Sequence, residues 1–136
     1  MKKELQDIAD KENLDVHFMG YCNQDTVIEF YALSDFFFLP SLQDCNPLSA
    51  IEAAFAGLPL CVSIYTGNSP ELIQPYKNGV VFDILDTEEV QACIYFLLNA
   101  SEEWVSNAGR ESLAIAQNSF ACINETKKFL AQLREG

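Results

Sequence analysis

The sequence predicts an α/β protein with a Rossmann-like, mostly parallel sheet of about four strands and helices on both faces. Short apolar runs alternate with helical patterns through the first hundred residues, as in chains built from β–α–β units. The run that begins at Asp35 and ends at Leu39 holds three consecutive Phe, which is typical of a strand covered on both faces. The length of 136 residues fits one domain with its own core.

The elements can be assigned in order along the chain. Apolar spacing and capping residues predict helices over residues 2–11, 24–33, 47–56, 69–74, 86–98, 101–117 and 120–133. Apolar runs predict strands over residues 15–19, 35–39, 58–64 and 80–82. The residues expected to face inward from the first two helices are Leu5, Ile8, Val27, Ile28 and Tyr31.

Composition and charge exclude several classes of protein. The net charge of −12 argues against nucleic acid and anionic membrane surfaces as partners. The five cysteines form no CxxC pair, which favours reduced thiols in a cytoplasmic protein, with Cys61 and Cys93 as small core residues. No run reaches membrane-spanning length, no signal peptide is evident, and no His, Cys or acidic cluster predicts a metal site.

The stretch from Pro40 to Pro59 organises the rest of the chain. Asn46 is a favourable N-cap and Pro47 fits the first turn of a helix. Gly57 suits the left-handed position that ends a helix, and Pro59 prevents continuation. The residues at helical spacing, expected to form its apolar face, are Leu48, Ile51 and Phe55.

Two acids in this stretch are the candidate binding residues. Asp44 lies in the loop before the helix and Glu52 lies on it, and carboxylates can accept hydrogen bonds from vicinal hydroxyls of a sugar or ribose. The free N–H groups of Leu48 and Ser49 would favour a phosphate. On spacing alone, however, a solvated loop acid and a partly exposed helix residue are the more common explanation.

A second turn, from Gly67 to Glu71, also follows a strand and precedes a helix. Gly67 would let the backbone approach a ligand closely, although an ordinary turn fits the same residues. His17, the only histidine, has no acid or cysteine cluster around it and is expected to be structural.

The order of these motifs resembles the C-terminal half of the retaining glycosyltransferases of the GT-B fold, of the family-4 or group 1 type. The resemblance covers about residues 16–109. The matching residues are Val16 to Gly20, Tyr31 to Asp35, Leu39-Pro40-Ser41, Asp44, Asn46-Pro47-Leu48, Glu52-Ala53, Gly57-Leu58-Pro59, Gly67, Pro70 to Ile73, Asn78-Gly79 and Asp86 to Glu89.

The resemblance implies a role for each candidate residue. Two acids of this family mark the donor site, and here they would be Asp44 and Glu52. Glu52 would bind the nucleotide ribose, and the donor sugar would contact Asp44, Asn46 and Pro47. The backbone facing the diphosphate would be that of Leu48, Ser49, Gly67 and Asn68. The donor would be a nucleoside-diphosphate sugar, with no bound metal or other cofactor.

The sequence departs from the family in two respects. Asp44 stands where the family has Glu, and Cys45-Asn46-Pro47 replaces the usual Gly-Phe-Gly. The family's C-terminal half also has two earlier strands, with a Gly-Arg turn and a Lys that hold the diphosphate, and an N-terminal acceptor domain precedes it. We therefore expect one partial nucleotide-sugar-binding domain over residues 1–136, with weak nucleotide binding and no activity alone.

The resemblance places the two earlier strands between the 15–19 strand and the 35–39 strand. Without them, the edge from Asp35 to Leu39 is expected either to pair with the first strand or to join two chains in a homodimer. Two other interpretations stay open: a non-catalytic, flavodoxin-like interaction module, and a subunit that completes a split glycosyltransferase. Membrane association of a full-length enzyme with a lipid-linked acceptor is also left open.

Overall fold

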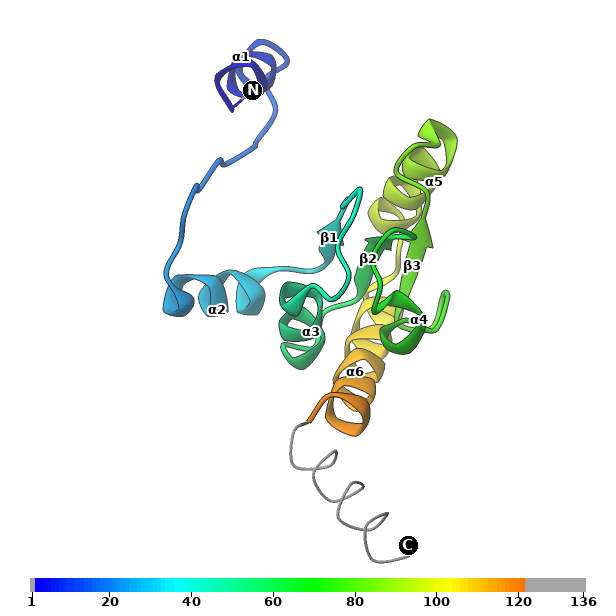
Figure 1. Cartoon of the computed structure of the whole chain (residues 1–136). Helices are drawn as coiled ribbons and strands as arrows, with labels where there is room; N and C mark the ends of the chain where they lie inside the picture. The colour runs from blue at the N-terminus through cyan, green and yellow to red at the C-terminus, as the bar shows by residue number, and fades with distance from the viewer. Residues whose placement is uncertain (1, 122–136) are drawn as a thin grey trace, which may run out of the picture.

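The computed structural model of the chain describes residues 2–121 (Figure 1). Nine elements follow in the order α1 (Lys2–Lys11), α2 (Gln24–Leu33), β1 (Phe37–Leu39), α3 (Leu48–Phe55), β2 (Leu60–Ser63), α4 (Ser69–Leu72), β3 (Gly79–Phe82), α5 (Thr87–Leu98) and α6 (Glu102–Ser119). The predicted helices are confirmed within a few residues at each end, except that the last one, over residues 120–133, lies almost entirely outside the described residues. None of the described helices is long and apolar enough to cross a membrane.

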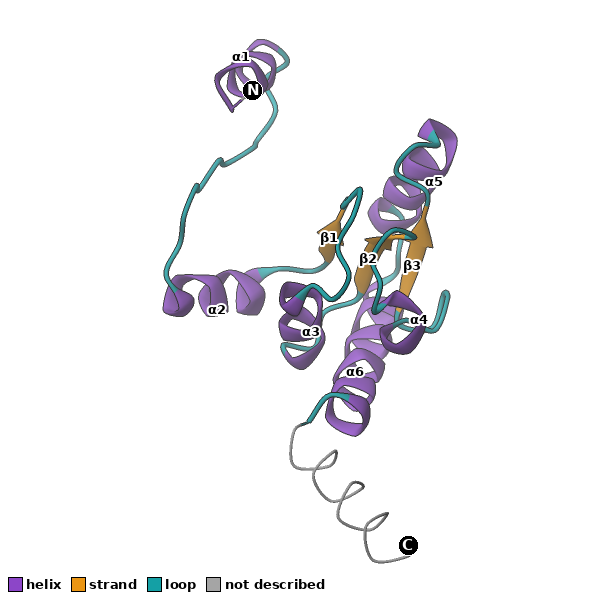
Figure 2. Ribbon diagram, viewed as in Figure 1, coloured by secondary structure: helices purple, strands orange, loops and turns teal. Residues whose placement is uncertain are grey.

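The sheet is parallel and its strands lie in the order β1-β2-β3 (Figure 2). Phe37 pairs with Leu60 at the start of β1, and Leu60 pairs in turn with Gly79 at the start of β3. The expected parallel sheet is therefore confirmed, but it has three strands in the described part of the chain instead of about four. β1 is an edge strand, because its outer side has no strand neighbour among the described residues.

The strand predicted over residues 15–19 does not form. This segment is extended but pairs with no strand, and Leu14, Val16 and Met19 are all exposed. An extended segment becomes a strand only when a neighbour accepts its backbone hydrogen bonds, and Figure 1 shows it running beside no other strand. Pairing of this segment with β1, one of the two expectations for the free edge, is thus wrong.

Helices cover both faces of the sheet, as predicted. Leu60 and Val62 of β2 point to one face, where they pack with α3, α4 and α6. Cys61 points to the other face and packs with Val80, Phe82 and Cys93 of β3 and α5. This alternation of neighbouring side chains is the two-residue period of a strand, and it gives the fold two cores on either side of β2.

The buried face of α3 consists of alanines. Ala50, Ala53 and Ala54 are fully buried, whereas Leu48 and Phe55, predicted to face the core, are 66% and 40% exposed. Of the predicted face only Ile51 packs against the core, because helical spacing alone does not show which side of α3 meets the sheet. Small side chains allow α3 to pack close to β1, β2 and α6.

The first two helices contribute little to the core. Leu5 and Ile8 are 47% and 54% exposed, and α1 stands apart from the sheet at the end of the extended segment (Figure 1). α2 buries none of its residues fully, and Ile28, expected to face inward, is exposed. The inward prediction is therefore wrong for Leu5, Ile8 and Ile28, whereas Val27 and Tyr31 are half-buried and Tyr31 packs against the core.

Cys61 and Cys93 are buried, as predicted, and neither is in a disulfide. A hydrogen bond with the Cys93 sulfur, together with burial, raises the pKa of the Cys61 thiol. Cys61 therefore remains a protonated core thiol at neutral pH.

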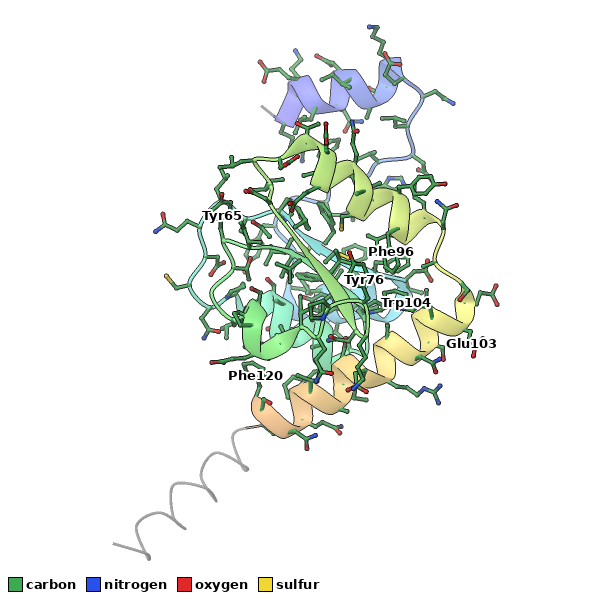
Figure 3. The ribbon with its side chains drawn as sticks, turned by 90° about the vertical axis from the view of Figure 1, so that its right-hand side faces the viewer. Tyr65, Tyr76, Phe96, Glu103, Trp104 and Phe120 are labelled. Carbon is green, nitrogen blue, oxygen red and sulfur yellow. The ribbon has the colours of Figure 1, made fainter. Side chains whose placement is uncertain are left out.

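Aromatic side chains join α5 to α6 at the far side of the sheet (Figure 3). The Phe96 ring packs edge-to-face against Tyr76 and Trp104, with centroids 5.7 Å and 4.9 Å away. The Trp104 indole N–H also donates to the Tyr76 carbonyl oxygen at 2.9 Å. These contacts hold the start of α6 in place, and α6 also packs against α3.

α3 and α6 meet through two glycines. Gly57 follows α3 with a φ of +77°, which confirms the predicted left-handed helix end. A Cβ built on Gly109 of α6 would lie 2.2 Å from the Gly57 carbonyl oxygen. The approach of the two backbones therefore requires glycine at position 109.

We expect Gly109→Ala to destabilise the fold by about 1–3 kcal/mol, because the methyl group forces α3 and α6 apart. Helix propensity alone predicts the opposite sign, since Ala is favoured over Gly by about 1 kcal/mol inside a helix. Urea unfolding followed by circular dichroism measures the difference. Ser106→Ala, at an exposed position of the same helix, is the control and should stay within about 0.5 kcal/mol. A more stable Gly109→Ala protein contradicts the packing.

Candidate functional site

The loops that follow β1 and β2 meet at the carboxyl edge of the sheet. Asp44 and Thr66 form an isolated parallel bridge between them. The Asp44 N–H donates to the Tyr65 carbonyl at 3.2 Å, and the Gly67 N–H donates to the Asp44 carbonyl at 2.8 Å. The two loops therefore continue the pairing of β1 with β2, at the edge where open α/β sheets bind their ligands.

Gly67 is required by the contact between these loops. A Cβ at this position would lie 2.2 Å from the Cys45 carbonyl oxygen, so any side chain would push the loops apart. The sequence predicted close approach of a ligand, whereas the neighbour within the chain is the backbone of Cys45.

Asn68 fastens the same two loops through its side chain. It is 4% exposed, and its Nδ2 lies 3.0 Å from Asn46 Oδ1 and 3.3 Å from the Pro47 carbonyl oxygen. Its own Oδ1 is buried with no hydrogen-bond partner in the described chain, as is the Thr66 hydroxyl. Leaving a buried acceptor unpaired costs about 1–3 kcal/mol, so the contacts of Nδ2 must outweigh that cost.

The N-terminus of α3 starts directly after this loop. Its N-cap is Pro47, whose side chain cannot accept a hydrogen bond, so the predicted cap at Asn46 is wrong. The Asn46 oxygen is occupied by Asn68 instead. In the described part of the chain, no group accepts from the N–H of Leu48 or Ser49, and such free donors favour anions.

Glu52 lies one turn along α3 and faces α2. The Tyr31 hydroxyl shares its single proton between Glu52 Oε2 at 3.3 Å and the Ser49 carbonyl oxygen at 3.2 Å. Burial, followed by the charge and hydrogen bond of Glu52, raises the pKa of Tyr31 to about 12. At neutral pH Tyr31 is therefore a donor that links the Glu52 carboxylate to the Ser49 carbonyl oxygen of α3.

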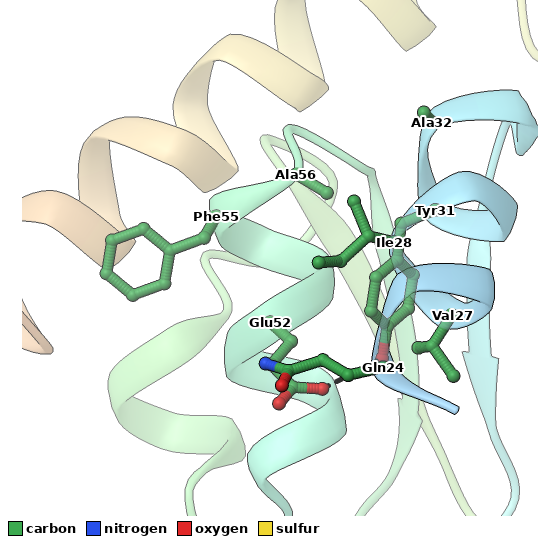
Figure 4. A pocket seen from close by; sticks show the side chains of 8 residues that line it. All are labelled: Gln24, Val27, Ile28, Tyr31, Ala32, Glu52, Phe55 and Ala56. Atoms are coloured by element: carbon green, nitrogen blue, oxygen red, sulfur yellow. Dashed lines mark hydrogen bonds between the residues drawn. The ribbon is translucent and has the colours of Figure 1, made fainter. Parts of the chain in front are cut away.

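A largely apolar pocket of about 440 Å³ lies between α2 and α3 (Figure 4). Glu52 and Tyr31 meet on its wall, and the dashed line in Figure 4 marks their hydrogen bond. Its lining residues are Gln24, Val27, Ile28, Tyr31, Ala32, Glu52, Phe55 and Ala56. The pocket thus offers apolar walls with a carboxylate beside them.

Positive charge is absent from this part of the sequence. No Lys or Arg occurs between residues 12 and 76, and Lys77 pairs with Glu111 of α6. Within residues 2–121, no three His, Cys, Asp or Glu side chains are grouped as metal ligands. An anion at this site would therefore be held by N–H groups.

The structure divides the predicted site residues into two groups. Asp44, Asn46 and Pro47 contact Gly67 and Asn68 through the joined loops. Glu52 lies with Tyr31 on the neighbouring side of α3.

The sequence analysis missed two contacts within these groups. It treated Tyr31 as a core residue, and 21 positions separate Tyr31 from Glu52, so no local signal links them. It likewise missed the Asn46–Asn68 contact, whose residues are 22 positions apart.

A comparison with protein families identifies the chain. The profile of the family described as glycosyl transferases group 1 matches residues 1–111. The chain belongs to this family. The match begins before residue 16, where the resemblance in the sequence begins, and it includes every residue of the candidate site.

Solved structures confirm the fold of this group 1 glycosyltransferase chain. Sucrose-phosphate synthase from Thermosynechococcus elongatus aligns with 98% of the chain at a TM-score of 0.78 and 22% identity. The C-terminal domain of the group 1 family protein LpcC from Francisella tularensis aligns with 89% at 0.71 and 17% identity. The fold is therefore that of a GT-B C-terminal domain. No curated protein matches the chain significantly.

The chain spans only part of these relatives. It covers 34% of the sucrose-phosphate synthase chain and 63% of the LpcC domain. The N-terminal domain of Candida albicans trehalose-6-phosphate phosphatase is also similar, with a TM-score of 0.76 at 15% identity, and 30% of that chain is covered. The group 1 chain is thus the counterpart of one portion of a GT-B protein.

We expect Tyr31→Phe to lower stability by about 1 kcal/mol, since the hydroxyl bonds to Glu52 and Ser49 are lost. A spectrophotometric pH titration should lose, in the variant, the tyrosine whose pKa is about 12 in the wild type, whereas Tyr65, whose pKa is also raised, titrates alike in both proteins. Because the folded pKa lies above the ordinary value of 10, wild-type stability is full below pH 10 and should fall between about pH 10 and 12. An unchanged titration would show that Tyr31 is not the raised group.

Proposed function

We propose that this group 1 glycosyltransferase chain is the donor-binding part of a retaining enzyme. Such an enzyme transfers a hexosyl group from a nucleoside-diphosphate sugar to a glycan or lipid-linked acceptor. One observation supports the proposal most: Tyr31 bonds both Glu52 and the Ser49 carbonyl oxygen of α3, a helix whose Leu48 and Ser49 N–H groups are free in the described chain. An acceptor for hydroxyls and donors for phosphate thus lie on one helix terminus.

Each group has a distinct part in this proposal. The Glu52 carboxylate accepts hydrogen bonds from the ribose hydroxyls, because a charged acceptor strengthens such bonds. The diphosphate binds the N–H groups of Leu48 and Ser49, beside the backbone of Gly67 and Asn68. The α3 dipole favours the negative charge by about 0.3–1 kcal/mol at an exposed terminus.

The donor sugar is assigned to the loop before α3, at Asp44, Asn46 and Pro47. Asp44 is half-buried, and its Oδ1 already accepts from the Asn46 N–H at 3.1 Å. Oδ2 is then the atom left for a sugar hydroxyl. We propose no metal or other cofactor at this site.

Binding by this chain alone is proposed to be weak and transfer absent, because no Lys or Arg occurs between residues 12 and 76, the stretch that carries the proposed site. The described cysteines are all free thiols, as suits the cytoplasmic location that we propose for a protein using nucleotide sugars.

We expect UDP, GDP or ADP at millimolar concentration to shift the ¹H–¹⁵N amide resonances of Leu48 and Ser49. Glu52→Gln keeps the size of the side chain but removes its charge, and should weaken this response at least tenfold, equivalent to about 1.4 kcal/mol. Glu103→Gln is the matched control, since Glu103 is an exposed glutamate near the start of α6, away from α3 (Figure 3). Absence of a response to all three nucleotides, or an equal response in Glu52→Gln, contradicts the proposal.

A second proposal concerns the surface formed by the outer edge of β1 and by α2. The strand has no neighbour on this side in the described chain, and α2 leaves Ile28 and Leu33 56% and 83% exposed. An uncovered strand edge beside apolar side chains favours association with another polypeptide. We propose that this surface is covered either by a second copy of the chain or by a subunit that completes a split enzyme.

If the partner is a second copy, sedimentation velocity should show a dimer that grows with protein concentration. Salt should promote it, because screening reduces repulsion between chains of charge −12. Leu33→Lys should weaken the dimer, whereas Leu85→Lys, at an exposed position 70% accessible before α5, should not. A monomer at every concentration and salt excludes the homodimer.

A further inference from the structure

We propose that Asn68 is a positioning residue, which orients Asn46 so that the Asn46 amide nitrogen faces the ligand beside the N–H groups of Leu48 and Ser49. The three nitrogens then form one neutral donor cluster for phosphate or sugar oxygens. The identity of that ligand rests on the proposed function, whereas the orientation is a property of the chain itself.

The contacts of Asn68 determine which end of its amide faces the loop. Its side-chain nitrogen lies 3.3 Å from the Pro47 carbonyl oxygen, which can only accept. Turning the amide around would place two acceptors against each other. The nitrogen must therefore face Pro47, and it reaches Asn46 Oδ1 at 3.0 Å from the same position.

Asn68 is itself held firmly. The residue is only 4% exposed. Its backbone lies next to Gly67, which packs against the Cys45 carbonyl. Its Oδ1 remains buried and unpaired within the described chain. In either orientation this amide leaves one of its two ends without a partner. Its contacts with Pro47 and Asn46 therefore determine which end faces the loop.

The contacts of each polar group of Asn46 show which group is left for a ligand. Its Oδ1 accepts from Asn68, and its backbone N–H donates to Asp44 Oδ1 at 3.1 Å. The side chain is exposed, so Nδ2 is the group left to meet a ligand. Without Asn68 the amide could rotate freely and present oxygen as readily as nitrogen.

This orientation matters because the surrounding charge is negative. No Lys or Arg lies between residues 12 and 76, and Asp44 adjoins the same loop. A neutral donor in a fixed direction adds attraction for an anion without any need for a basic side chain.

Asn68→Asp tests the orientation without any ligand. A carboxylate cannot donate to Pro47, and Asn46 must turn its nitrogen toward the new acid. We expect the Asn46 side-chain and the Leu48 and Ser49 amide resonances to shift, with those of β3 unchanged. Asn99→Asp, an exposed change of equal charge in a residue whose Nδ2 donates to the Tyr95 carbonyl, should leave the α3 resonances in place. Unshifted resonances at Asn46, Leu48 and Ser49 in Asn68→Asp overturn the proposal.

Asn46→Asp tests whether Asn68 orients the Asn46 amide or only stabilises the loop. This test does not depend on whether the Asn68 variant folds. The new carboxylate still accepts from Asn68 but no longer donates outward. We therefore expect the Asn68 side-chain NH₂ protons to stay slow in exchange, because they still donate to position 46, while nucleotide affinity falls at least tenfold. Retained affinity in Asn46→Asp overturns the role of the Asn46 nitrogen.

The double variant Asn46→Ala/Asn68→Ala completes the test. The single variants for comparison are Asn46→Ala and Asn68→Ala. If Asn68 acts through Asn46, the double variant should bind nucleotide as well as the weaker-binding single variant does, whereas additive losses of affinity contradict the proposal. If the wild type binds no nucleotide, the proposed function fails, and the ligand-free spectra of Asn68→Asp alone then decide the positioning role.

Discussion

The close packing of α3 against the sheet is the constraint on which the candidate site depends. Ala50, Ala53 and Ala54 are fully buried, and with alanines on its inner face the helix lies near β1, β2 and α6 at once. Larger residues of the same helix are forced to other faces, which places Glu52 opposite Tyr31 and leaves the first turn open. The donor groups and the carboxylate are thus positioned by small residues that contact no ligand.

The position of α3 is coupled to the loops at the carboxyl edge of the sheet. α3 begins at Leu48, directly after a loop that is bridged to the next one through Asp44 and Thr66. Gly67 permits this bridge because a Cβ there would meet the Cys45 carbonyl. Two glycines, at positions 67 and 109, therefore fix the helix from opposite ends, one through the loop and one through α6. A change at either end would move the first turn of α3 relative to the joined loops and to Tyr31 of α2.

The sequence predicted the regular elements well and the contacts between distant residues poorly. The helix starts predicted at residues 86 and 101 and the stop at Gly57 depend on local signals, and the structure agrees with all three, with Asp86 and Ser101 as the N-caps. Asp44, Glu52 and Gly67 were identified by their order along the chain. The partners Tyr31 and Asn68 depend on how α2 and α4 pack, which no local pattern reports. The buried face of α3 was missed because this short helix carries both large apolar residues and three alanines, and hydrophobicity favoured the larger residues.

The predicted strand over residues 15–19 shows what a local pattern cannot supply. Its alternating residues have strand propensity, yet propensity in a sheet mainly measures the fit of a residue to its neighbours. No neighbour stands beside this segment within the described residues, and its side chains remain exposed. Even so, 98% of the chain aligns with sucrose-phosphate synthase at a TM-score of 0.78, while only 34% of that protein is covered. The chain therefore has the fold of one portion of that longer protein, and the extended segment pairs with no strand within the described residues.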